Sequence, residues 1–94
     1  MNLQLLRKPT QAGVTLSFEF AVSGSHFLVK NFTEDDIYVS FDLEEQNEIL
    51  IPAECSQVCI TGETGSWNAL NTDIVYVRPI STSEKGVEVQ CLKW

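Results

Sequence analysis

The side chains that could catalyse a reaction are few in this sequence. His26 is the single histidine, and Ser25 precedes it directly. A serine nucleophile needs a base within hydrogen-bond reach, and histidine is the usual base near neutral pH. However, no Gly-x-Ser-x-Gly elbow surrounds Ser25, and the chain has neither a Walker loop nor a Gly-x-Gly-x-x-Gly motif. We interpret His26 as a polar residue at the start of a strand, and we predict that the protein is not an enzyme.

Acidic and cysteine side chains are the possible metal ligands of this chain. The acids gather in two segments, Glu34–Asp36 and Asp42–Glu48. Neither segment has the alternating ligands around a central glycine that a calcium loop needs, so solvent-exposed turns are favoured and a weak cation site is the alternative. Cys55 and Cys59 are three residues apart instead of the two common in zinc sites, and Cys91 is distant. We expect small buried thiols, no metal and no cofactor.

The charge of the chain argues against two classes of partner. Thirteen acids against 6 bases give a formal net charge of −7, and Arg7–Lys8 is the single adjacent basic pair. Nucleic acids and anionic membranes both select clustered basic residues, so we expect neither as a partner. No segment approaches the roughly 18–20 apolar residues of a membrane span. In residues 1–10 the charges follow the apolar part, unlike a signal peptide, so we expect synthesis and folding in a cytoplasm.

The elements that must position these side chains are β-strands. Apolar residues alternate with polar ones over residues 13–22, which is the period of a half-buried strand. Similar short segments, separated by turn residues, predict six further strands at 26–30, 37–41, 48–51, 56–61, 73–78 and 87–92. In the segment 56–61, Val58 and Ile60 are expected to face the core. The pattern predicts an all-β antiparallel β-sandwich of about seven strands, with a jelly roll as one form that it could take.

The chain is long enough for one domain, which we place at residues 13–94. Residues 1–12 form either an N-terminal arm that reaches a neighbouring subunit or a first strand that joins the sheet. The apolar side chains of this segment are candidates for an interaction surface: Leu3, Leu5 and Leu6.

Two tryptophans are further candidates for interaction. Trp67 lies in a segment rich in Gly and Asn, and Trp94 ends the sequence. An exposed aromatic ring suits a protein interface or stacking on a sugar, whereas packing over the end of the β-sandwich is the alternative.

Four segments of the chain also carry a family resemblance: Phe27–Ser40, Ile49–Val58, Asp73–Val77 and Gly86–Gln90. Taken together, over roughly residues 26–90, they resemble small β-domain structural proteins of tailed phages and prophages. Glu54 stands where those proteins have Gly after Ile-Pro-Ala. The resemblance carries no catalytic residues with it.

The resemblance implies a non-enzymatic virion component, synthesised in the cytoplasm of a bacterial host and located in the virion as a head-decoration, head–tail or fibre-associated protein. Such a protein would act through contacts with copies of itself, as a homo-oligomer, and with other virion proteins. The alternative is a module that binds a carbohydrate or a host receptor through the Trp67 loop. A small hydrolase or isomerase on a cupin-like barrel fits less well, because such barrels hold a metal with several histidines.

Overall fold

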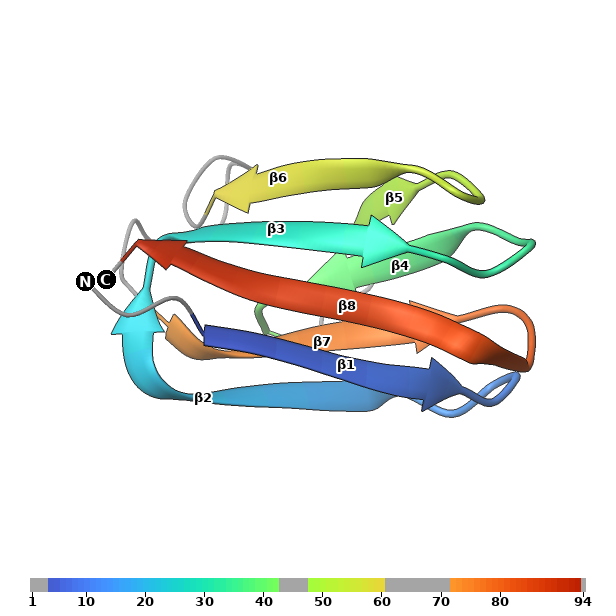
Figure 1. The fold of residues 1–94 in the computed structure, drawn as a ribbon, viewed down its shortest axis with the longest axis horizontal. Helices are drawn as coiled ribbons and strands as arrows, with labels where there is room; N and C mark the ends of the chain where they lie inside the picture. The colour runs from blue at the N-terminus through green and yellow to red at the C-terminus, as the bar shows by residue number, and fades with distance from the viewer. Residues whose placement is uncertain (1–3, 43–47, 61–71, 94) are drawn as a thin grey trace.

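The computed structural model describes residues 4–42, 48–60 and 72–93, and in these residues the chain is all β. The strands are β1 (Gln4–Thr10), β2 (Leu16–Gly24), β3 (His26–Asn31), β4 (Ile37–Ser40), β5 (Ile49–Ile51), β6 (Ser56–Ile60), β7 (Thr72–Pro79) and β8 (Ser83–Lys93). They form two antiparallel four-stranded sheets with the orders β1-β8-β3-β6 and β2-β7-β4-β5 (Figure 1). The predicted all-β class is confirmed. The described residues include no helix that is long and apolar enough to cross a membrane.

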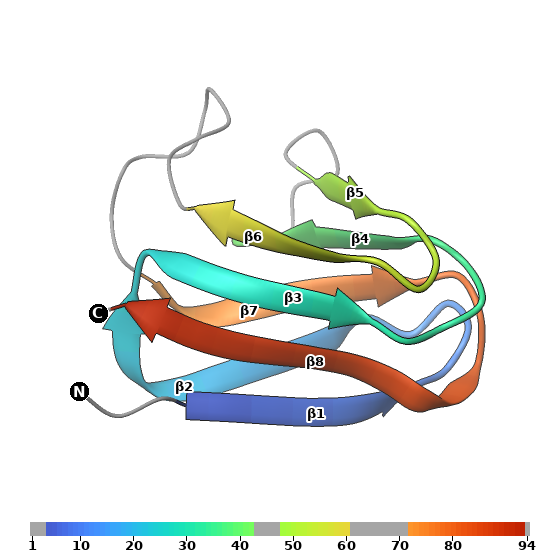
Figure 2. The same ribbon diagram turned by 45° about the horizontal axis from the view of Figure 1, so that its top comes forward.

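The strand pairs are nested around the β4–β5 pair. β4 pairs with β5, β3 with β6, β2 with β7 and β1 with β8, all antiparallel. Successive pairs alternate between the two sheets, and β3–β8 and β4–β7 contacts join the pairs within each sheet. The sheet β1-β8-β3-β6 lies in front of the other sheet in Figure 2.

The hydrophobic core takes alternate side chains from both sheets, so it lies between them. Phe18 of β2 and Phe27 of β3 are fully buried. The Phe27 ring lies 5.6 Å from the ring of Phe20 and 5.5 Å from that of Phe41, measured between centroids. The buried cluster consists of Phe18, Phe20, Phe27, Val29, Ile37, Val39, Ile51, Cys59, Val75, Val77, Val87, Val89 and Cys91. The inward alternation expected for β2, β3 and β4 is therefore present in the described residues.

The described chain has eight strands, not about seven, because the N-terminal segment is itself a strand. β1 pairs with β8 along almost its whole length, from Gln4 opposite Cys91 to Lys8 opposite Val87. Its two adjacent leucines break the apolar alternation, and of the two alternatives, an arm or a first strand that joins the sheet, the strand is present. The backbone groups of β8 supply hydrogen-bond partners along this segment, so it joins the sheet as an edge strand.

Two segment boundaries also differ from the prediction. Val14 is 44% exposed and precedes β2, because its N–H donates to the carbonyl of Gln11 (3.0 Å) in a turn. The last strand, predicted over 87–92, begins earlier, because β8 starts at Ser83. This is possible because Gly86 adopts φ +68° and lets the strand continue against β1.

The turns that join the two sheets are held by Asn31, at the end of β3. Its side-chain Nδ2 donates to the carbonyls of Asp35 (2.9 Å), Ile51 (3.3 Å) and Pro52 (3.1 Å). Its Oδ1 accepts from the N–H of Thr33 (2.9 Å) and from the Thr33 hydroxyl (2.7 Å). Asn31 is 2% exposed, so this side chain ties the turn after β3 to the end of β5.

Glu54 lies in the left-handed region with φ 59°. The N–H of Cys55 donates to the carbonyl of Pro52 (3.2 Å), which closes a four-residue turn with Glu54 at its third position. A positive φ at that position is the mark of a type II turn, where glycine is preferred. The turn therefore has the geometry that glycine would favour, although glutamate occupies it.

Candidate functional site

Ser25 and His26 are in contact, but as sequence neighbours. The Ser25 Oγ lies 2.8 Å from the His26 Nδ1. A catalytic base needs a third group that orients its ring, and no carboxylate of the described residues is hydrogen-bonded to this one. His26 opens β3, as predicted, and pairs with Ile60 and Lys93. The contact orders the start of a strand.

The acidic side chains lie apart or are already engaged. Glu34 and Asp35 are exposed, whereas the Asp36 Oδ1 accepts from the N–H of Ala53 (3.3 Å). Residues 43–47 of the second acidic segment lie outside the described residues. Within the described ranges, no group of three or more His, Cys, Asp or Glu side chains could hold a metal ion.

The three cysteine thiols differ in solvent exposure. Cys59 and Cys91 are buried, and each lies directly opposite Phe27, on either side of β3. Cys55 is exposed in the turn before β6, so the expectation that all the thiols are buried is wrong for this residue.

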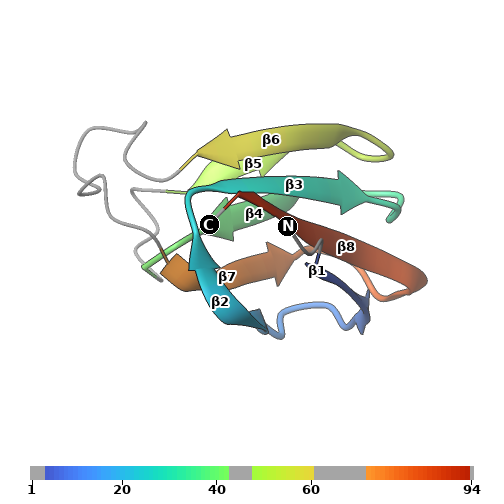
Figure 3. The ribbon, with the colours of Figure 1, turned by 60° about the vertical axis from the view of Figure 1, so that its left-hand side comes forward.

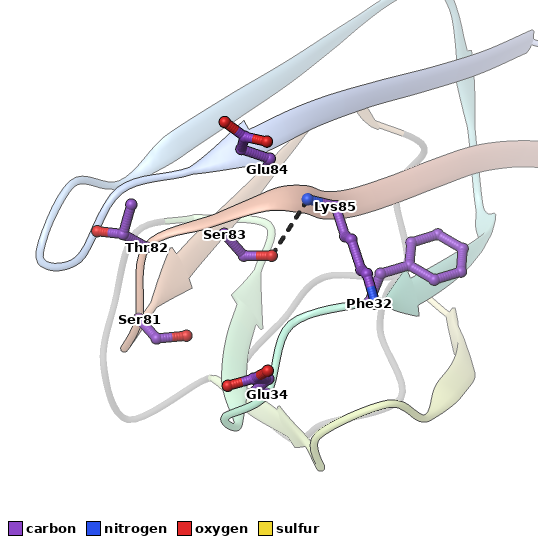
Figure 4. Close-up of a pocket in the computed structure, with 7 residues that line it drawn as sticks. All are labelled: Phe32, Glu34, Ser81, Thr82, Ser83, Glu84 and Lys85. Carbon is purple, nitrogen blue, oxygen red and sulfur yellow. Dashed lines mark hydrogen bonds between the residues drawn. The ribbon is translucent and has the colours of Figure 1, made fainter.

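A pocket of about 330 Å³ opens beside the start of β8 (Figure 4). It is lined by Phe32, Glu34, Ser81, Thr82, Ser83, Glu84 and Lys85. The Ser83 Oγ accepts from the N–H groups of Lys85 (3.2 Å) and Gly86 (3.4 Å), and the Thr82 Oγ1 accepts from the N–H of Ala12 (3.0 Å). These hydroxyls shape the β7–β8 turn and tie it to the chain after β1.

A row of mostly apolar side chains crosses the outer face of the sheet β1-β8-β3-β6. Leu5 lies opposite Gln90, Gln90 opposite Leu28, and Leu28 opposite Val58, so the row spans all four strands. We call these four residues the outer row. Leu5 is 47% exposed and Val58 is 44% exposed, whereas Gln90 and Leu28 are partly buried. The row is an apolar strip on the side of the sheet that faces away from the core.

A charged row runs beside the outer row on the same face. Arg7 lies opposite Glu88, Glu88 opposite Lys30, and Lys30 opposite Ser56. The Lys30 Nζ lies 3.6 Å from the Glu88 Oε2, and the Gln90 Nε2 donates to the same oxygen (2.8 Å). The signs alternate along this row, from positive through negative to positive.

Strand β6 turns its apolar residues outward, contrary to the prediction that Val58 and Ile60 face the core. The register places Cys59 opposite Phe27, whose ring is fully buried, so Cys59 points inward and its two neighbours point outward. A shift of one residue would reverse this arrangement. The pairing with β3 therefore decides the faces of β6, against the hydrophobicity of its own residues.

The outer face of the other sheet carries an ion pair over an aromatic ring, beside Leu50, which is 44% exposed and lies opposite Tyr38. Arg78 binds Glu48 through two hydrogen bonds, from Nε to Oε2 (3.0 Å) and from Nη2 to Oε1 (2.7 Å). The same guanidinium lies 4.3 Å from the centre of the Tyr38 ring. Because the cation already covers one face of this ring, that face is not free to stack on a sugar.

The residues predicted for interaction differ in where the structure places them. Leu5 is exposed and belongs to the outer row, whereas Leu6 is partly buried and packs against the core. Leu3, Trp67 and Trp94 lie outside the described residues. Leu28 and Val58 were missed, because only strand pairing brings them into one row with Leu5.

Comparison with known proteins gives no match: no family model, no curated protein and no solved structure is significantly similar to this chain.

Proposed function

We propose that this protein is a non-enzymatic structural component of a tailed-phage virion and that it acts through protein–protein contacts. The observation that carries the proposal is the outer row. The exposed face of an antiparallel sheet normally carries polar side chains. Here Leu5, Leu28 and Val58 occupy three of the four positions across the sheet. A partner that covers this face would remove the strip from water.

The outer row and the charged row have complementary roles in such a contact. Full burial of a leucine or valine side chain contributes about 1.5–3 kcal/mol, so half-exposed Leu5 and Val58 each retain roughly 1 kcal/mol for a partner. Charges at an interface contribute more to orientation and specificity than to affinity. The alternating signs of the charged row would therefore set the direction in which a partner lies.

The fold supports the same proposal. Nested antiparallel pairs that alternate between two four-stranded sheets follow from rolling up one long hairpin. We propose that the two sheets form a β-sandwich of the jelly-roll type, an architecture used by viral capsid domains as well as by lectins and cupins.

The family resemblance supplies the virion context. It covers roughly residues 26–90 and implies a head-decoration, head–tail or fibre-associated position. The turn at Glu54 is compatible with the resemblance, because φ 59° favours glycine, the residue that the resembled phage proteins have at this position. Contacts with copies of the chain and with other virion proteins are the partners that follow from this proposal.

Purified particles test the virion assignment. Phage particles from the induced source strain would be isolated on a density gradient, and the chain would be quantified in them by mass spectrometry. We expect it in the particle fraction at a constant ratio to the capsid protein. Its recovery in the soluble lysate alone would refute the assignment.

Incorporation of variants tests the outer row. We expect the double variant Leu5→Ser, Val58→Ser to be lost from particles. The matched control is Val14→Ser, Ile80→Ser, which removes similarly exposed apolar side chains (44% and 47%) that lie outside the strands. Equal incorporation of both double variants would exclude the outer row as the contact. Saturable glycan binding that is lost in Trp67→Ala would instead support the carbohydrate-binding module.

A further inference from the structure

Strand edges differ sharply in how they are protected. β1, at one edge of its sheet, contains Arg7, Lys8 and Pro9, and charge and proline both discourage pairing. The edge of β2 is occupied by side chains of β1: the Gln4 Oε1 accepts from the N–H of Ala21 (3.0 Å), and the Lys8 Nζ donates to the carbonyl of Ser17. The fourth kind of protection is shortness: β5, at the edge of the second sheet, has three residues and ends before a proline. Of the four edge strands, β1, β2, β5 and β6, the first three are therefore either blocked or short.

β6 is the exception. It lies at the edge of its sheet with β3 on one side, and no strand of the described chain pairs with its other side (Figure 3). Its five residues, Ser-Gln-Val-Cys-Ile, include no charge and no proline. An edge without such features is a template for pairing with another strand.

The backbone of β6 presents donors and acceptors at this edge. The N–H of Asn31 donates to the carbonyl of Cys55 (2.8 Å), which makes these two residues a hydrogen-bonded pair. Hydrogen-bonded and non-hydrogen-bonded pairs alternate along an antiparallel ladder. Ser56, Val58 and Ile60 are therefore in non-hydrogen-bonded pairs with β3, and their N–H and C=O groups point toward the open edge.

We propose that a second copy of this chain pairs with this edge, β6 against β6, antiparallel about a two-fold axis at Val58. This register places Val58 opposite the same residue of the second copy, Ser56 opposite Ile60, and Gln57 opposite Cys59. No charges meet, although the chain as a whole carries −7. A two-fold contact is self-complementary and closes on itself.

The proposed pairing also extends the outer row. Leu28 lies next to Val58 on the outer face, so the two copies would bring both pairs of residues into one continuous apolar strip across four strands, β3 and β6 of each copy. The inference thus deepens the proposed function and rests on it in one respect, since it assigns a second copy as one of the protein partners.

A disulfide across the two-fold axis tests the register. Cα atoms of a hydrogen-bonded antiparallel pair lie about 5.5 Å apart, within the roughly 4.4–6.8 Å that a disulfide spans. In a Cys55→Ser background, which removes the exposed native thiol, Val58→Cys is oxidised mildly and analysed on a non-reducing gel. The matched control is Leu5→Cys in the same background, a similarly exposed position on the opposite edge strand. We expect a cross-linked dimer for Val58→Cys and monomer for Leu5→Cys. Equal cross-linking of both variants would overturn the proposal.

Solution mass tests the pairing without cross-linking. We expect light scattering on the full chain to give twice the 10.5 kDa of one copy. Val58→Pro removes an N–H that points away from β3, so it should preserve the sheet and abolish the dimer. Val58→Thr, a β-branched control that keeps the N–H, should remain dimeric. Circular dichroism confirms that each variant is folded.

A monomeric wild-type chain at high concentration, or a dimer that persists in folded Val58→Pro, would overturn the pairing. Because the purified chain is tested alone, either result leaves the particle experiment unaffected, and the two proposals fail separately.

Discussion

Gly86 offers a sharp test of how β1 is held on the sheet. Its backbone has φ +68°, and a Cβ atom added there would lie 1.9 Å from the carbonyl oxygen of Lys8 and 2.8 Å from the Cα of Pro9. Both neighbours are backbone atoms of β1, so neither can rotate away. The variant Gly86→Ala must therefore either push β1 from β8 or distort β8 itself.

Gly13 is a control that separates two causes of destabilisation in Gly86→Ala, the left-handed backbone and the steric clash with β1. It also has a positive φ (+78°), but nothing lies within 4 Å of the position of its Cβ. A left-handed alanine costs about 1–2 kcal/mol, and the less flexible unfolded chain returns about 0.4–1 kcal/mol, so Gly13→Ala should destabilise by about 1 kcal/mol. Gly86→Ala adds overpacking of about 1–3 kcal/mol, for a total of roughly 2–4 kcal/mol.

Chemical denaturation followed by far-UV circular dichroism measures both free energies of unfolding. A domain of 94 residues is stable by roughly 5–14 kcal/mol, so the loss in Gly86→Ala should be a large fraction of the total. Equal losses in the two glycine variants would refute the reasoning, because they would show that the backbone of Lys8 does not approach Gly86.

The turns between the sheets yield two further predictions. Asn31→Ala removes the buried side chain that donates to the carbonyls of Asp35, Ile51 and Pro52, and it should lower the free energy of unfolding by about 2–4 kcal/mol. Thr33→Val removes a single hydroxyl from the same network and should lower it by about 1 kcal/mol. Denaturant titration measures both losses, and a larger loss in Thr33→Val than in Asn31→Ala would contradict the role of Asn31. Glu54→Gly should stabilise the protein by about 0.5–1 kcal/mol, because glycine adopts φ 59° without steric cost, and an unchanged or lower melting temperature would contradict this.

Local patterns were sufficient to predict a strand and its buried face where the strand pairing buries the side chains that alternate as apolar in its own sequence. Phe18 and Phe20 in β2, and Ile37 and Val39 in β4, occur every second residue, and all four are buried. Side chains alternate across any strand, so these segments are recognisable without knowledge of their partners. The all-β class and most strand positions follow from such segments.

Local patterns failed where another strand decides the outcome. Val58 and Ile60 are the most apolar residues of β6, yet Cys59 points inward because β3 places it opposite Phe27. β1 is a strand because β8 supplies its backbone partners, although Leu5 and Leu6 are adjacent and do not alternate. The sequence of a strand does not contain the register of its pairing.

The sequence by itself determined the class of the protein, since alternation and turn residues act over a few neighbouring positions. It also contains no run of basic residues beyond Arg7–Lys8 and no familiar catalytic motif, which are properties of composition and spacing. Only the tertiary structure determined the outer row and the open edge of β6. Leu5, Leu28, Val58 and Gln90 are far apart in the chain, and they become neighbours only when four strands are hydrogen-bonded in one register.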